Sequence, residues 1–168
     1  MRPVLLAKIT LMLAGFLAFQ RWNDPARLLA QASDASEGLT AEEKEAVKKA
    51  KGSEEQLKIY LEIASERLKA ILSLARKGDE EGTAKAVTAY RTAVSAAEDS
   101  VAKGQAAGKN MKKALMSLQK ATRKFNFSLL QALEKVPENL RQQIQSAYEV
   151  SLRVQDSVSI QLEKIEKK

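Results

Sequence analysis

Acidic side chains provide the first candidates for chemistry in this sequence of 168 residues. They form two short clusters, Asp79-Glu80-Glu81 and Glu98-Asp99. Paired carboxylates can transfer protons or hold hard cations. Adjacent residues on a helix, however, point about 100° apart, and neither cluster lies in a loop that would wrap around a metal ion. The first cluster is explained as the start of a helix, so we expect no catalytic or metal site in either.

The sequence contains no His and no Cys. This composition excludes disulfides, thiolate and imidazole metal sites, and every catalytic triad that needs one of these residues. Scattered Ser and Thr residues have no His to activate them. The stretch from Gly104 to Gly108 lacks the preceding strand and the Lys-Ser/Thr pair of a phosphate-binding loop. We therefore predict a protein that is not an enzyme and that has no cofactor.

Basic residues provide the most informative candidate for binding. Seven of them lie between Ser100 and Leu133, a span without Asp or Glu. We call them the basic stripe: Lys103, Lys109, Lys112, Lys113, Lys120, Arg123 and Lys124. The interpretation we favour is an ordinary solvated face, partly paired with Glu138, Glu149 and Asp156. The alternative is an anionic partner such as phospholipid headgroups or a wall polymer, which the stripe and the formal net charge of +7 would suit. Nucleic acid is the weaker partner, because the stripe lacks aromatic side chains that could stack on bases.

An apolar repeat predicts the element that carries the basic stripe. Positions three and four residues apart alternate without a slip, which keeps one side of a helix facing a partner. We call them the seam: Val87, Tyr90, Val94, Ala97, Val101, Gly104, Gly108, Met111, Leu115, Leu118, Thr122, Phe125, Leu129, Ala132 and Val136. The unbroken repeat predicts one long helix, in which Gly104 and Gly108 let another helix approach closely. The alternative is a kink between these two glycines, which would fold the chain into a four-helix bundle.

The predicted fold class is all-α, with three long antiparallel helices at about 41–77, 79–136 and 138–166 in a coiled-coil-like arrangement. The first helix begins with a capping box at Thr40, and Gly52 is a possible stop before a second, firmer start at Ser53. Turn signals separate the helices, because Lys77-Gly78-Asp79 and Val136-Pro137 have the residues that end one helix and begin another. Short turns make neighbouring helices antiparallel.

Residues 1–32 differ in character from the rest of the chain. An uncharged apolar run of eleven residues, Ile9–Phe19, follows Arg2 and Lys8. That length suits the core of a signal peptide and is short of the roughly 20 residues that a membrane span needs. Ala30-Gln31-Ala32 fits a cleavage site, although it lies well beyond the apolar run.

These features predict a signal peptide at residues 1–32, a polar linker at 33–39 and a helical domain at 40–168. An uncleaved N-terminal anchor and an ordinary amphipathic helix remain the alternatives. The predicted location is outside the cytoplasm, as a secreted or anchored protein.

The stretch from Ala64 to Ala97 resembles a family of exported bacterial helical domains of unknown function. A leucine-rich helix ending in a KGD-like turn leads into a helix with an Ala-x3-Tyr pattern in that family. The matching residues here are Leu68, Lys77, Gly78, Asp79, Ala86 and Tyr90. The resemblance implies an exported, mostly helical protein, and it implies no activity and no site residues.

A second resemblance concerns Leu39-Thr40-Ala41-Glu42-Glu43, which is similar to the Leu-Thr-x-x-Gln repeat of periplasmic helical chaperones. Glu43 replaces the Gln, and the sequence contains no second copy.

The function predicted from all these features is non-enzymatic binding at the cell envelope. The partner could be a protein, or an anionic membrane or polymer bound by the basic stripe. A holdase-like chaperone is the other alternative. Self-association is also open, because apolar side chains such as Ile63, Leu74 and Leu130 flank the seam.

Overall fold

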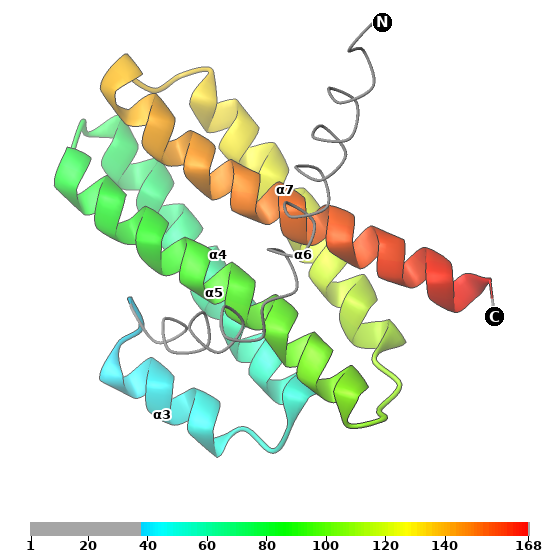
Figure 1. Ribbon diagram of the computed structural model, residues 1–168. Coiled ribbons are helices and arrows are strands. Elements are labelled where there is room, and N and C mark those ends of the chain that lie inside the picture. Colours follow the sequence, from blue (N-terminus) through cyan, green and yellow to red (C-terminus); the bar gives the residue numbers. More distant parts are fainter. Residues whose placement is uncertain (1–37, 168) are drawn as a thin grey trace, which may run out of the picture. The chain divides into compact units, whose positions relative to one another are not determined.

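The computed structural model describes residues 38–167, which form helices joined by short turns (Figure 1). No strand occurs in this range, so the predicted all-α class is confirmed. The predicted signal or anchor segment, residues 1–32, lies outside the described residues. The helices are α3 (Ala41–Lys49), α4 (Ser53–Arg76), α5 (Glu80–Ala106), α6 (Lys112–Leu133) and α7 (Glu138–Glu166).

The predicted first helix, at 41–77, is wrong because it is two helices. Thr40 begins α3 with the expected capping box, since its side chain accepts from the Glu43 amide and the Glu43 carboxylate accepts from the Thr40 amide. The chain then turns at Gly52, whose φ of 153° and ψ of 178° suit a residue without a side chain. The firmer of the two predicted starts is therefore the start of a separate helix, α4.

The predicted long helix at 79–136 is also wrong, because Gly108 ends it. The backbone of Gly108 is left-handed, with a φ of 72°. Its amide donates to the Gln105 carbonyl at 2.9 Å, and the Lys109 amide donates to the Gly104 carbonyl at 3.0 Å. This pair of bonds is a Schellman motif, the usual glycine-dependent end of a helix. The chain reverses direction over residues 107–111. The alternative prediction, a break near Gly104 and Gly108 that folds the chain into a four-helix bundle, is therefore the correct one.

The same motif ends α4 at the turn that the sequence did predict. Gly78 has a φ of 72° and donates to the Ala75 carbonyl, while Asp79 donates to the Leu74 carbonyl. The Asp79 side chain then accepts from the Gly82 amide at 2.9 Å and caps α5. At the second turn Asn110 takes a related part, because its side-chain oxygen accepts from the Lys112 amide at 3.1 Å. The two reversals therefore use the same backbone geometry.

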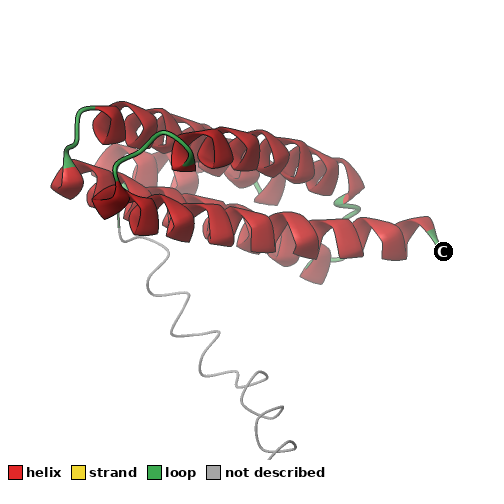
Figure 2. Ribbon diagram, turned by 90° about the horizontal axis from the view of Figure 1, so that it is seen from above, coloured by secondary structure: helices red, strands yellow, loops and turns green. Residues whose placement is uncertain are grey.

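Helices α4 to α7 form a bundle built from two helical hairpins, α4–α5 and α6–α7 (Figures 1 and 2). The hairpins pack so that α5 lies beside α7 and α4 lies beside α6. Asn139 donates to Glu80, and Arg153 pairs with Glu98 at 3.4 Å, so α5 and α7 run in the same direction. Although α5 and α6 are consecutive, they lie diagonally across the core.

The seam forms the core on both sides of the reversal. All of its positions are buried except Gly108, which is exposed, and Val136, which is half-buried. The repeat stays unbroken because α5 and α6 both turn their apolar sides toward the same centre. Gly104 is buried against the Met111 side chain, and an added Cβ would lie only 2.5 Å from the Met111 sulfur. Gly104 thus makes room for the Met111 side chain, and Gly108 forms the turn. Neither glycine has the predicted role of letting another helix backbone approach.

Tyr90 lies at the centre of the bundle and is fully buried. Its ring meets the edge of Phe125, with centroids 5.9 Å apart and planes at 74°, a favourable aromatic geometry. Among the described residues, neither the Tyr90 hydroxyl nor the facing Ser151 hydroxyl has a hydrogen-bond partner. Burial raises the pKa of Tyr90 well above its ordinary value, and the neighbouring Ser151 opposes the shift only in part.

The left-handed turn at Gly108 is open to a direct test. Gly108→Ala should lower the free energy of unfolding by about 1 kcal/mol, because a Cβ is strained at this φ. Urea unfolding followed by circular dichroism measures the change. Gly108→Asn should lose less, since Asn tolerates the left-handed region, and Gly78→Ala should lose a similar amount. Equal stability of Gly108→Ala and the parent protein would contradict the reversal.

The buried phenol makes stability depend on pH in the alkaline range. Above pH 10 the unfolded chain loses the Tyr90 proton while the folded chain keeps it, so folding weakens by about 1.4 kcal/mol per pH unit. Tyr90→Phe removes this loss, so its stability relative to the parent protein should increase by about 1 kcal/mol between pH 10 and pH 11. At pH 7 the two should differ by no more than about 1 kcal/mol. Urea unfolding at each pH measures the difference, and parallel pH profiles would show that Tyr90 is not buried in the fold.

Candidate anionic-surface site on helix α6

The outer face of α6 carries most of the basic stripe. Lys113, Lys120, Arg123 and Lys124 are exposed on this helix, and Lys112 is half-buried at its start. The reversal separates the remaining two members. Lys109 lies in the turn, with its amine over Gly52 at the start of α4, and Lys103 stays on α5. The expected stripe along one helix is therefore a cluster on α6 with Lys109 at its end.

Lys103 belongs to a different neighbourhood, around Asp99 on α5. Burial raises the pKa of Asp99, and the positive charges of Lys103 and Arg153 offset part of that shift. A cation that already compensates a nearby carboxylate contributes little to an external partner. We therefore leave Lys103 out of the site.

No member of the basic stripe forms an ion pair with another described residue. The pairing expected with the last helix is therefore not formed within residues 38–167. Glu138 pairs with Arg141 on its own helix at 2.7 Å, and Glu149 accepts from Gln145 at 3.1 Å. The cations of α6 thus keep their charge available to solvent or to a partner.

The first turn of α6 differs from the first turns of the other described helices. Those helices have acidic residues there, as at Glu80 and Glu81 on α5, whereas α6 has Lys112 and Lys113 and no acid. The N-terminus of a helix carries a partial positive charge, so cations at this position are unfavourable for folding. The start of α6 thus concentrates positive charge at some cost in stability.

Three large apolar side chains interrupt the basic residues on the outside of α6. Phe127 is 64% exposed, Met116 is 55% exposed and Leu130 is 44% exposed. Met116, Arg123 and Leu130 follow one another at intervals of seven residues, so they form a line along one side of the helix. Phe127 lies next to this line, four residues after Arg123. Phe127 was missed as a candidate in the sequence, although its spacing of four residues from Arg123 and three from Leu130 could have placed it on this side of the helix.

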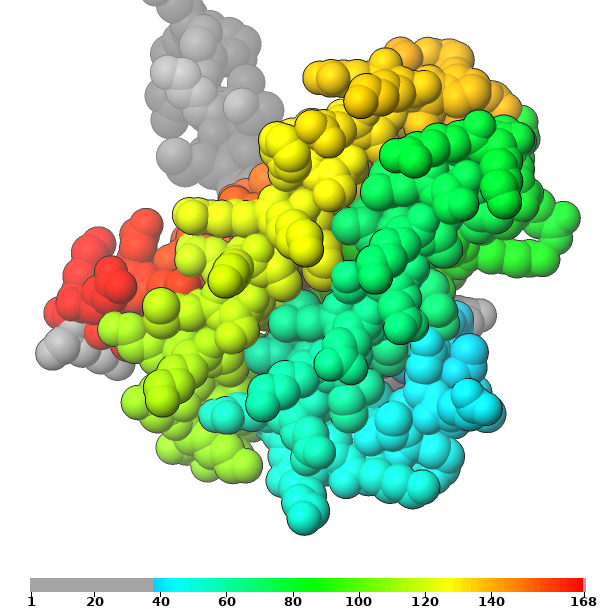
Figure 3. Space-filling view, turned by 180° about the vertical axis from the view of Figure 1, so that it is seen from behind, coloured from blue at the N-terminus to red at the C-terminus, as the bar shows by residue number. Residues whose placement is uncertain are grey.

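The two helices that flank α6 carry exposed acidic residues as well as basic ones. Figure 3 shows the face on which α4 and α6 lie side by side, and α7 flanks α6 through hydrogen bonds from Gln119 to Ser159 and from Asn126 to Gln155. The exposed acids of the two flanking helices are Glu54, Glu55, Glu62 and Glu66 on α4, and Glu138, Glu149, Asp156, Glu163 and Glu166 on α7. The surface that is positive, partly apolar and free of acids is therefore a ridge along α6 itself.

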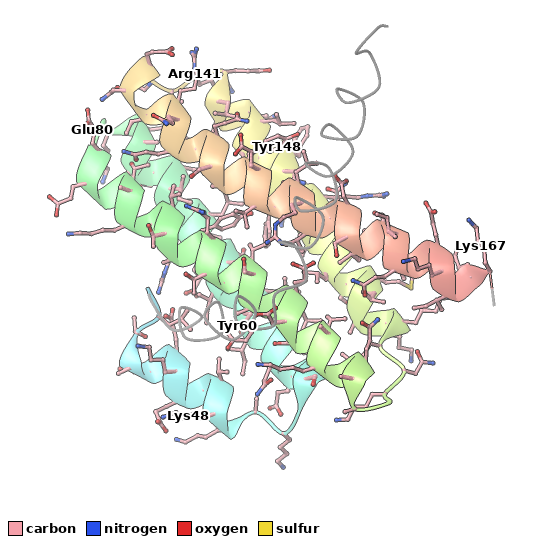
Figure 4. The ribbon with its side chains drawn as sticks, in the orientation of Figure 1. Lys48, Tyr60, Glu80, Arg141, Tyr148 and Lys167 are labelled. Carbon is pink, nitrogen blue, oxygen red and sulfur yellow. The ribbon has the colours of Figure 1, made fainter. Side chains whose placement is uncertain are left out.

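Carboxylates of both clusters take part in contacts within the fold, and Glu98 of the second cluster pairs with Arg153 at 3.4 Å. Asp79 caps α5, Glu81 pairs with Lys85 at 2.6 Å, and Glu80 accepts from Asn139. Glu80 and Arg141 mark the end of the bundle where α5 and α7 begin, and Lys167 marks the end of α7 (Figure 4). Between residues 38 and 167 no group of three acidic side chains could hold a metal ion.

An open groove of about 490 Å³ lies along the first half of α5. Small side chains line most of it, including Ala86 and Ala89. Its two cations are already paired, Arg67 with Glu43 at 2.6 Å and Lys85 with Glu81. The groove therefore presents no free charged group for a ligand, and the α6 face is the stronger candidate.

No family model matches the sequence, and comparisons with curated proteins and with solved structures give no match. The resemblance to exported helical domains therefore stays a prediction. Within residues 38–167, no helix combines the length and apolar character required to cross a bilayer.

The charge at the start of α6 makes a testable contribution to stability. Lys113→Glu should raise the free energy of unfolding by about 0.3–1 kcal/mol, because an acid interacts favourably with the helix N-terminus. Lys120→Glu, in the middle of the same helix, is the matched control and should give no such gain. Urea unfolding at low ionic strength measures both variants. Equal changes in the two would show that the position in the helix does not matter.

Proposed function

We propose that the protein is a non-enzymatic binding module of the cell envelope that attaches to an anionic surface through the outer face of α6. The observation that carries the proposal is the absence of ion pairs for the α6 cations among the described residues. Unpaired cations clustered on one ridge attract an extended anionic partner more strongly than paired cations do. The apolar run in residues 1–32 supports a location at the envelope, as a cleaved signal or as an anchor.

Charge reversal on α6 tests the proposal. The triple variant Lys120→Glu, Arg123→Glu and Lys124→Glu should bind vesicles containing anionic phosphatidylglycerol about 100-fold more weakly than the parent chain, since each basic residue near such a surface contributes about 1 kcal/mol. Co-sedimentation of the full chain measures the affinity. Binding by the parent chain should also weaken as salt rises from about 50 to about 500 mM, because ions screen the attraction.

A matched control separates local charge from net charge. Lys48→Glu, Lys85→Glu and Arg91→Glu change the net charge by the same amount on other helices, α3 and α5, and should retain most of the affinity. Equal losses in the two triple variants would mean that only the total charge matters. Undiminished binding by the α6 variant would refute the proposal.

A further inference from the structure

The outer face of α6 carries exposed apolar side chains as well as cations. These apolar side chains indicate which kind of anionic surface the face binds. Phe127, Met116 and Leu130 are all large and at least 44% exposed. A polyanion without aromatic groups, such as polyphosphate, is held by cations and has no apolar region that an exposed Phe could enter. The interfacial region of a bilayer accepts both kinds of group, because apolar side chains enter the boundary with the acyl chains while cations meet the headgroups.

The arrangement of the two kinds of residue suits a helix that lies parallel to a membrane surface. Met116, Phe127 and Leu130 are spaced at intervals of eleven and three residues, which keeps them on one side of α6. Arg123 lies between them in sequence and on the same side. Lys113, Lys120 and Lys124 are exposed beside them, and long basic side chains can extend from such a position to the headgroups. One ridge therefore offers apolar groups with cations around them.

A second copy of this chain is a poorer partner for the same ridge. In a twofold dimer the same patch meets itself, so the unpaired cations of one α6 would face those of the other. Like charges placed against each other oppose association. The acidic residues of α4 and α7, including Glu66 and Asp156, are exposed on the flanking helices and do not lie on α6 itself.

We infer that the partner of α6 is the surface of an anionic lipid bilayer, with Phe127, Leu130 and Met116 entering its interfacial region. This inference rests on the proposed function and names the partner of that site. It separates a membrane from polyphosphate or another soluble polyanion without aromatic groups, because only the membrane has an apolar region for these side chains.

The first experiment compares two variants of the full chain. Phe127→Ser with Leu130→Ser should weaken binding to phosphatidylglycerol vesicles at least about tenfold and leave binding to inorganic polyphosphate unchanged. Ile160→Ser is the matched control, since Ile160 is 53% exposed on α7, and it should bind both probes like the parent chain. The substituted side chains are exposed, so the helical circular dichroism spectrum should be retained.

The second experiment reads the position of α6 directly, even if residues 1–32 also attach to the vesicles. The chain has no Cys, so Gln131→Cys gives a single site for an environment-sensitive fluorophore one residue after Leu130. Its emission should shift to the blue on anionic vesicles and be quenched by a spin label carried at the headgroup level. Ala102→Cys, exposed on α5 across the bundle, should show neither effect.

The outcomes distinguish the inference from the function on which it rests. If the serine variant binds vesicles like the parent chain and the label at residue 131 does not respond, the bilayer inference is overturned. If the charge variant still loses binding in that case, the proposed function stands with a polyanion as partner. If neither variant loses binding, both fail. Disulfide-linked dimers of the unlabelled Gln131→Cys variant, formed without lipid, would instead identify a second copy as the partner and overturn the inference.

Discussion

The left-handed backbone at Gly108 is the constraint on which the rest of the structure depends. It ends α5 after its last core contact and lets the chain reverse within five residues. A residue with a Cβ at this position would favour continuing the helix, and the second half of the seam would then need a partner elsewhere. With the reversal, α5 and α6 place their apolar sides on one core, where Tyr90 meets Phe125.

The reversal also determines what the outside of the bundle presents. In the ring of four helices, α6 touches α4 on one side and α7 on the other, so only its inner side and flanks are covered. Residues that would have lain along one helix are divided, and Lys103 remains beside Asp99 on α5. The cations of α6, in contrast, lie on a ridge with no acid between Lys112 and Leu133. Positive charge and exposed apolar groups occur together on this ridge because no neighbouring helix covers the outer side of α6.

Much of the fold could be predicted because local rules decide it. The capping box at Thr40, the turn at Gly78 and the helix start after Pro137 depend on residues within one or two turns of each other. The seam residues were also identified as core, since burial follows the apolar period. The continuous helix was wrong because a 3-4 repeat reports which residues face the core and does not report whether the chain reverses between them. The four-helix bundle could have been preferred only by giving the helix-ending tendency of Gly108 more weight than the unbroken repeat.

The sequence by itself determined the all-helical class, the buried seam, the lack of His and Cys chemistry, and the charge run without acids between Ser100 and Leu133. Each of these depends on composition or on spacing within one helix. Only the tertiary structure decided that Lys103 leaves the stripe, that no α6 cation pairs with an acid of α7 among the described residues, and that the side of α6 with Phe127 and Leu130 stays uncovered. These facts depend on which helices are neighbours, and that follows from the reversal and from the packing of the two hairpins around one core.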